Sequence, residues 1–195
     1  NLSLYNEFVK QKAYTDAYTS YKVLVDICPA SRKGIYLNGV KMYRDLIAKE
    51  EDAAKKQVLI DELMTLFDIR IANFGQEGYV LGRKGVEMFK FNDDPCAAKD
   101  ILQRSIEVSG DKAEAAIIST YYQTLYKCYR TGNVDLETMF TEYLTLSDII
   151  NINIERFDTS AEDEDEEDSS GGRKEKYVKA KNNLDEFFIQ FADCK

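Results

Sequence analysis

Side chains that could carry out catalysis are restricted mainly to carboxylates, because the chain contains no histidine. Histidine is the commonest general base and metal ligand, and the usual partner of a nucleophilic Ser or Cys. Paired acids in a deep pocket remain as a route to catalysis, with Asp61 and Glu62, or Glu87 and Glu114, as the candidates. A carboxylate-dependent enzyme or a carbohydrate-binding helical protein is therefore one hypothesis. The composition favours a protein without chemistry of its own, and we expect no enzymatic activity and no cofactor.

The cysteines do not have the spacing of a metal site. Cys28, Cys96, Cys128 and Cys194 are far apart in the chain and no CxxC pair occurs. A zinc site would need all four thiolates to converge, so we predict none. Three disulfide pairings stay open, and so does a reduced state in which the cysteines pack as small apolar residues.

Two glycines, Gly82 and Gly85, are the nearest approach to a phosphate-binding loop. Such a loop connects a strand to a helix, whereas these glycines fall inside a helical pattern. We interpret them as positions where two helices pack closely.

The net charge of -9 is concentrated in one segment. Eight acidic residues lie between Asp158 and Asp168, so the rest of the chain is almost neutral and shows no concentrated basic patch for nucleic acid. The acidic run lacks the alternating ligands and central glycine of a calcium loop. It predicts a flexible, solvated linker over 158–173. A weak, salt-screened contact with a basic surface is a further possibility, formed by Arg173, Lys174, Lys176 and Lys179.

Apolar residues recur at helical spacing along almost the whole chain, and only two prolines occur. The pattern predicts helices at about 4–12, 15–27, 31–50, 52–73, 77–91, 95–109, 112–130, 135–156 and 174–193, and requires no strand. Pro29, Gly75 and Gly110 mark helix ends. Asp94 is expected to be the N-cap of the sixth helix, with Pro95 in its first turn. Most of the 13 tyrosines are expected to pack in the core, and no apolar run is long enough to cross a bilayer.

The segment Tyr5 to Pro29 resembles a tetratricopeptide repeat. A small residue lets the two helices approach, bulky residues fill the groove one and two turns later, and a proline closes the unit. The matching residues are Tyr5, Phe8, Ala17, Tyr21, Leu24 and Pro29. Leu81-Gly82, followed by Ala98 and Leu102, looks like a degenerate later copy. Helix pairs at intervals of about 35 to 45 residues are typical of a helical solenoid.

This resemblance implies an all-α fold: an alpha-alpha superhelix of helical hairpin repeats with a C-terminal capping helix. The expected domains are a repeat domain at 1–157, an acidic flexible linker at 158–173 and a capping helix at 174–195.

Tetratricopeptide repeats bind peptides or proteins on a concave face lined by their first helices, so the resemblance implies a non-enzymatic interaction scaffold. Asn6 matches the position of a peptide-backbone-binding asparagine in peptide-clamping members, although the accompanying lysine is not evident in this unit. A structural subunit that mainly self-associates is the alternative. The expected partner-binding residues are Asn6, Asn38, Lys41, Arg83, Lys84 and Gln123.

The stretches YNEFVKQKAYTDAY, LIDELMTLFDIRI and YVLGRKGVEMF resemble a group of exported tetratricopeptide-like proteins of Bacteroides-type bacteria. The resemblance implies a periplasmic or cell-envelope protein whose secretion signal precedes Asn1, with a cytoplasmic location still open. Export would let a disulfide persist. Under that condition the first expected pairing is Cys28 with Cys194.

Overall fold

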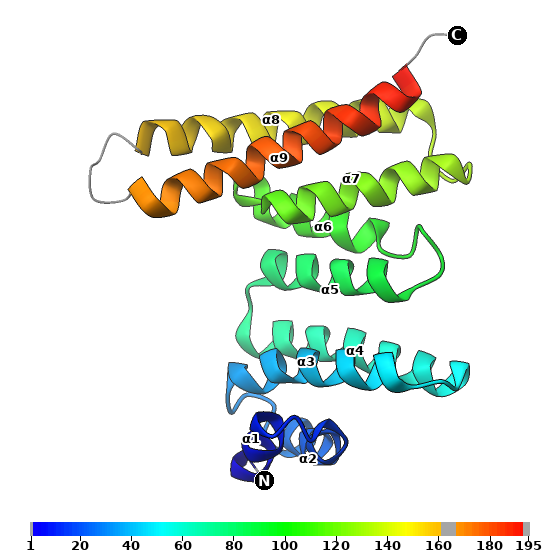
Figure 1. The fold of residues 1–195 in the computed structure, drawn as a ribbon, viewed down its shortest axis with the longest axis vertical. Coiled ribbons are helices and arrows are strands. Elements are labelled where there is room, and N and C mark those ends of the chain that lie inside the picture. The colour runs from blue at the N-terminus through cyan, green and yellow to red at the C-terminus, as the bar shows by residue number, and fades with distance from the viewer. Residues whose placement is uncertain (1, 161–166, 193–195) are drawn as a thin grey trace. The chain divides into compact units, whose positions relative to one another are not determined.

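The computed structural model describes residues 2–160 and 167–192, and every regular element within them is a helix (Figure 1). The predicted all-α fold is confirmed. The chain divides into two compact units, Asn1–Val80 and Leu81–Lys195. None of the helices in the described ranges combines the length and the apolar character that crossing a bilayer requires.

Unit 1 consists of helices in which each packs against the next in the chain. They are α1 (Leu2–Lys10), α2 (Tyr14–Ile27), α3 (Lys33–Lys49) and α4 (Ala53–Phe74), followed by the first turn of α5 (Glu77–Phe91). Helix α4 begins where the Asp52 carboxylate accepts a hydrogen bond from the Lys55 N–H at 3.0 Å. It ends at Gly75, whose φ of 64° is the left-handed conformation that glycine adopts without strain.

Tyrosines fill the interior of unit 1. The Tyr5 hydroxyl donates to the Ile35 carbonyl oxygen at 2.9 Å, which ties α1 to α3. The rings of Tyr21 and Tyr43 meet edge to face with centroids 5.7 Å apart, while the small side chain of Ala17 is fully buried beside them in α2. The expectation that the tyrosines form core is confirmed by the largest fully buried side chains of the chain, among them Tyr5, Tyr36, Tyr43, Tyr121 and Tyr122.

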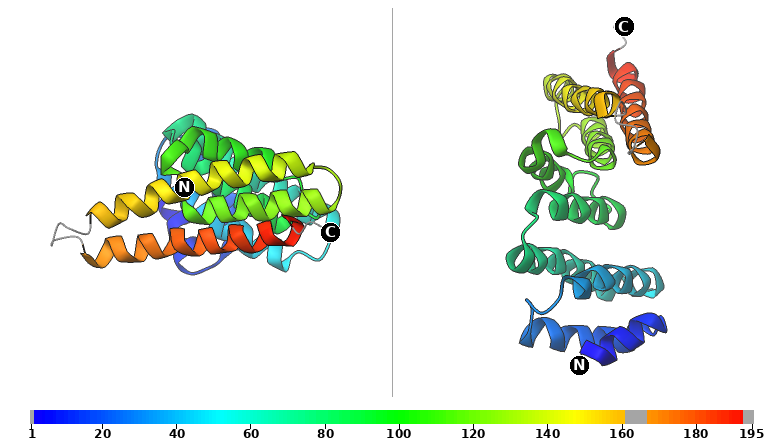
Figure 2. Two further views of the ribbon diagram at one scale, coloured as in Figure 1. Left: turned by 90° about the horizontal axis from the view of Figure 1, so that it is seen from above. Right: turned by 90° about the vertical axis from the view of Figure 1, so that its left-hand side faces the viewer.

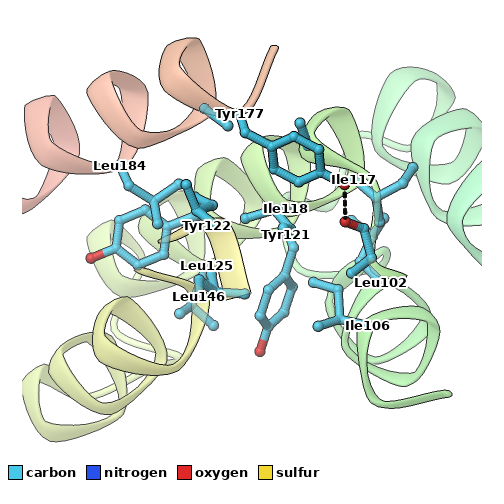
Figure 3. Close-up of a cluster of buried hydrophobic side chains, with 14 of the residues drawn as sticks. Leu102, Ile106, Ile117, Ile118, Tyr121, Tyr122, Leu125, Leu146, Tyr177 and Leu184 are labelled. Carbon is cyan, nitrogen blue, oxygen red and sulfur yellow. Dashed lines mark hydrogen bonds between the residues drawn. The ribbon is translucent and has the colours of Figure 1, made fainter. Parts of the chain in front are cut away.

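Unit 2 is built around α7, which packs against α6, α8 and α9. The elements after α5 are α6 (Lys99–Ser109), a 3-10 turn (Gly110–Lys112), α7 (Ala115–Arg130), α8 (Leu136–Ser160) and α9 (Glu167–Ala192). Helices α8 and α9 lie side by side along much of their length (Figure 2). Figure 3 shows the shared core, to which Leu184 of α9, Tyr122 of α7 and Leu146 of α8 all contribute. Helix α9 therefore buries its apolar side within unit 2.

The largest differences from the expected boundaries lie at the proposed linker and at the start of α6. The proposed linker 158–173 is helical at both ends, because α8 continues to Ser160 and α9 begins at Glu167, with 161–166 outside the described residues. The linker was predicted from its charge density, which gives no information about aromatic packing. In the structure Phe157 and Tyr177 pack together next to this segment, with ring centroids 5.9 Å apart. At the other boundary, the Asp94 carboxylate caps a turn by accepting the Cys96 N–H at 2.8 Å, so α6 begins only at Lys99.

The close packing expected at Gly82 and Gly85 is present. A methyl group at Gly85 would lie 2.5 Å from two side-chain carbons of Leu102, and one at Gly82 would lie 2.9 Å from the Ser105 hydroxyl. These glycines allow α5 to approach α6 more closely than any other residue would.

We expect Gly85→Ala to lower the free energy of unfolding by about 1–2 kcal/mol, because overpacking outweighs the gain in helix propensity. The matched control is Gly172→Ala in α9, where nothing lies within 4 Å of the added methyl group. That substitution is expected to be neutral or to stabilise by up to about 1 kcal/mol. Urea unfolding followed by circular dichroism measures both, and equal effects would contradict the close approach.

Candidate functional site

The six predicted partner-binding residues are distributed over both units. Asn6 lies on α1, while Asn38 and Lys41 lie on α3; Arg83 and Lys84 lie on α5, and Gln123 on α7. Lys41 is exposed and the other five are half-buried. Of the six, Arg83 lines a hollow in the surface of unit 2.

This hollow has a volume of about 420 Å³ and is bordered by four helices of unit 2. Arg83 comes from α5, Phe157 from the end of α8, and Tyr177 from α9. A second hollow of about 330 Å³ continues from it between α7 and α9, sharing Ala115, Ala116 and Lys176. We call the two together the α7–α9 groove; its lining is Arg83, Glu114, Ala115, Ala116, Ser119, Phe157, Arg173, Lys176, Tyr177, Lys179, Ala180 and Asn183.

Small side chains make the floor of the groove. Ala115 and Ala116 form the first turn of α7, Ser119 follows one turn later, and Ala180 lies on α9. Their short side chains leave space between two neighbouring helices that larger residues would fill. The buried Tyr177 fixes the helices on either side of this space, since its hydroxyl donates to the Ala113 carbonyl oxygen at 2.9 Å (Figure 3).

Basic side chains line the groove above this floor. Arg83 forms an ion pair with Glu114, with 2.5 Å between Nη2 and Oε2. Arg173, Lys176 and Lys179 have no ion-pair partner within the part of the chain that the structure describes. Four cations and one carboxylate therefore line the groove, in a chain whose net charge is -9. The groove has the local charge to attract an anionic group.

The acids considered for catalysis have other hydrogen-bond partners. Glu62 accepts from the Tyr18 hydroxyl at 2.8 Å, from the Tyr43 hydroxyl at 3.2 Å and from Lys22 at 2.6 Å. Burial, and then the hydrogen bond to Glu62, raise the pKa of Tyr18 to about 12. Asp61, next to Glu62, accepts instead from Gln57 at 2.9 Å. The cluster joins α2, α3 and α4 through one carboxylate.

In the second candidate pair, Glu87 is only 2% exposed and Glu114 is engaged by Arg83. Within the described residues, no group of three or more His, Cys, Asp or Glu side chains is placed to hold a metal ion.

The disulfide in the structure is not the one expected first. Cys96 and Cys128 are bonded, with their Cα atoms 5.4 Å apart. Cys28 is exposed and carries a free thiol, and Cys194 lies outside the described residues. The reason is the hairpin of α6 and α7, which brings the turn before α6 next to the last turn of α7.

Arg173, Lys176 and Lys179 were not predicted as site residues, because their position in the sequence suggested only a surface for the acidic run. A signal was present: three basic residues at intervals of three share one side of a helix, next to the inward residues Tyr177 and Ala180. Comparison with known proteins assigns no relative, since no family model and no curated protein matches the chain.

Proposed function

We propose that the protein is a non-catalytic interaction scaffold of tetratricopeptide type, which binds a segment of a partner protein in the α7–α9 groove. The observation that carries this proposal is the groove itself: an open strip with a floor of small residues and a border of four cations, of which Arg173, Lys176 and Lys179 have no ion-pair partner in the described residues. A protein segment can fill such a strip with its backbone and side chains together.

The proposed binding surface lies in unit 2 alone, whereas the resemblance distributes it over the first helix of each pair in both units. Arg83 is common to both surfaces, since it lies on α5 and also lines the groove. Asn6, Asn38 and Lys41 belong to unit 1 and line none of the groove. Export is part of the same proposal and is supported by the Cys96–Cys128 disulfide, because such bonds persist in oxidising compartments.

Site-directed photocrosslinking tests this function. Benzoylphenylalanine at Ala116, which is exposed in the groove, is expected to capture one defined protein in the cells that produce the chain. The same group at Leu144 is the control, since Leu144 is 62% exposed on α8 of the same unit and lines neither hollow of the groove. Mass spectrometry identifies the captured protein.

Equal capture from both positions would contradict a groove-specific partner. Capture of nothing, while both variants keep a helical circular dichroism spectrum, would contradict the interaction function. A crosslinked product that contains only this chain would favour the self-associating alternative.

A further inference from the structure

We propose that the α7–α9 groove selects an acidic segment, bound in extended conformation with its carboxylates against Arg173, Lys176 and Lys179. This inference rests on the proposed function and adds the chemistry of the partner. It follows from three properties of the groove: its charge, its length and its floor.

The charge of the groove is opposite to that of the chain. Three cations border it without an ion-pair partner in the described ranges, whereas the neighbouring Lys174 is paired with Asp158 and Arg83 with Glu114. Lysines that face solvent in a chain of net charge -9 would reach lower energy beside carboxylates of a partner. A partner with basic residues here would meet repulsion from all three.

The length of the groove suits a short extended segment. Arg173 and Asn183 are its first and last residues on α9, and ten residues of helix correspond to about 15 Å. An extended chain advances about 3.3 Å per residue, so about five residues cover this distance. Alternate side chains of an extended segment point to the same side, which lets alternate acidic residues face the cations.

The floor of the groove favours a peptide over other polyanions. Ala115, Ala116 and Ala180 offer an apolar contact, and the Asn183 amide can donate to or accept from a peptide backbone. Nucleic acids need many phosphate contacts, whereas the groove offers three cations without an ion-pair partner in the described residues. A peptide with two or three carboxylates matches the number of available cations.

Fluorescence anisotropy with a labelled hexapeptide of alternating Glu and Ala tests the proposal on the full chain. The same peptide with Gln in place of Glu is the ligand control. We expect the acidic peptide to bind more tightly, and its affinity to fall between 50 and 200 mM salt, as screened charges require.

The variant Lys176→Glu/Lys179→Glu is expected to weaken this binding at least tenfold. The matched control, Lys10→Glu/Lys55→Glu, changes the net charge by the same amount at two exposed lysines of unit 1 and is expected to leave the affinity within twofold. Circular dichroism of both variants checks that the fold is kept.

Equal affinities for the Glu and Gln peptides, or equal losses in the two variants, would overturn the proposal. Binding that appears only after residues 162–168 are replaced by Ser and Gly would also overturn it, because the chain's own acidic run would then be the occupant. So would tighter binding of a single-stranded oligonucleotide or of phosphatidylglycerol vesicles that depends on the same two lysines. If the peptide fails while Ala116 still captures a protein, the proposed function stands and the acidic chemistry is wrong.

Discussion

Reduction of the disulfide between Cys96 and Cys128 is expected to lower the free energy of unfolding of unit 2 by about 3–4 kcal/mol. The bond closes a loop over a sequence separation of 32, and it restricts the unfolded chain more than the folded one. This loss is a large part of the free energy of unfolding of a typical domain, which is about 5–15 kcal/mol. Urea unfolding followed by circular dichroism, with and without dithiothreitol, measures it.

Two cysteine variants separate this effect from a general effect of the reductant. Cys96→Ser is expected to match the reduced wild-type protein and to show no further response to dithiothreitol. Cys28→Ser removes the exposed free thiol and is expected to change the free energy of unfolding by less than about 0.5 kcal/mol. A wild-type protein that unfolds at the same urea concentration in both conditions would contradict the stabilising role.

The disulfide also shows how far the sequence could predict the fold. Cys96 and Cys128 stand at equal distances on either side of Lys112, the last residue of the turn between α6 and α7. Two antiparallel helices joined by a short turn bring such symmetric positions together. The sequence predicted both helices, at about 95–109 and 112–130, but it paired the sixth helix with the fifth and not with the seventh. The expected pairing of Cys28 with Cys194 assumed instead that the last helix contacts the first repeat unit. No local sequence pattern specifies such a contact.

Helix ends were predictable where a single residue determines the backbone. Gly75 and Gly110 both adopt positive φ, at 64° and 53°, as expected of glycines that end α4 and α6. The start of α6 was predicted too early from Asp94 and Pro95, because an aspartate before a proline is as well suited to a turn as to an N-cap. The hydrogen bond from Cys96 to Asp94 selects the turn, and this choice depends on the contact of Cys96 with α7.

The candidate site was less predictable than the fold, because it depends on a contact between helices far apart in the chain. Ala113 and Tyr177 are joined by a hydrogen bond over a separation of 64 residues. That contact places Lys176 of α9 beside Ala115 and Ala116 at the start of α7. Periodicity identifies the buried face of α9, but not which helix that face covers. The sequence of one helix therefore does not predict a groove that forms between two helices.

Alkaline pH is expected to unfold the protein abruptly, because burial raises the pKa of several tyrosines well above 10. A raised pKa means that the unfolded state loses its protons first, so stability is complete below about pH 10 and falls as the pH rises towards the folded-state pKa. Each tyrosine contributes a loss of up to about 1.4 kcal/mol per pH unit in that interval. The tyrosines concerned are Tyr5, Tyr21, Tyr43, Tyr121 and Tyr122.

The three tyrosines of unit 1 together remove up to about 4 kcal/mol per pH unit, and the two of unit 2 up to about 3 kcal/mol, so a rise of two pH units costs each compact unit an amount within the roughly 5–15 kcal/mol that stabilise a typical domain. We therefore expect the helical circular dichroism signal and the tyrosinate absorbance to change together between about pH 11 and 12. Tyr21→Phe is the diagnostic variant, because it keeps the ring contacts of a residue that is 2% exposed while removing one ionisable hydroxyl. It is expected to move the transition to higher pH. Tyrosinate absorbance that rises fully near pH 10 while the helices persist would show that these hydroxyls are accessible to solvent, and would contradict the packing of both cores.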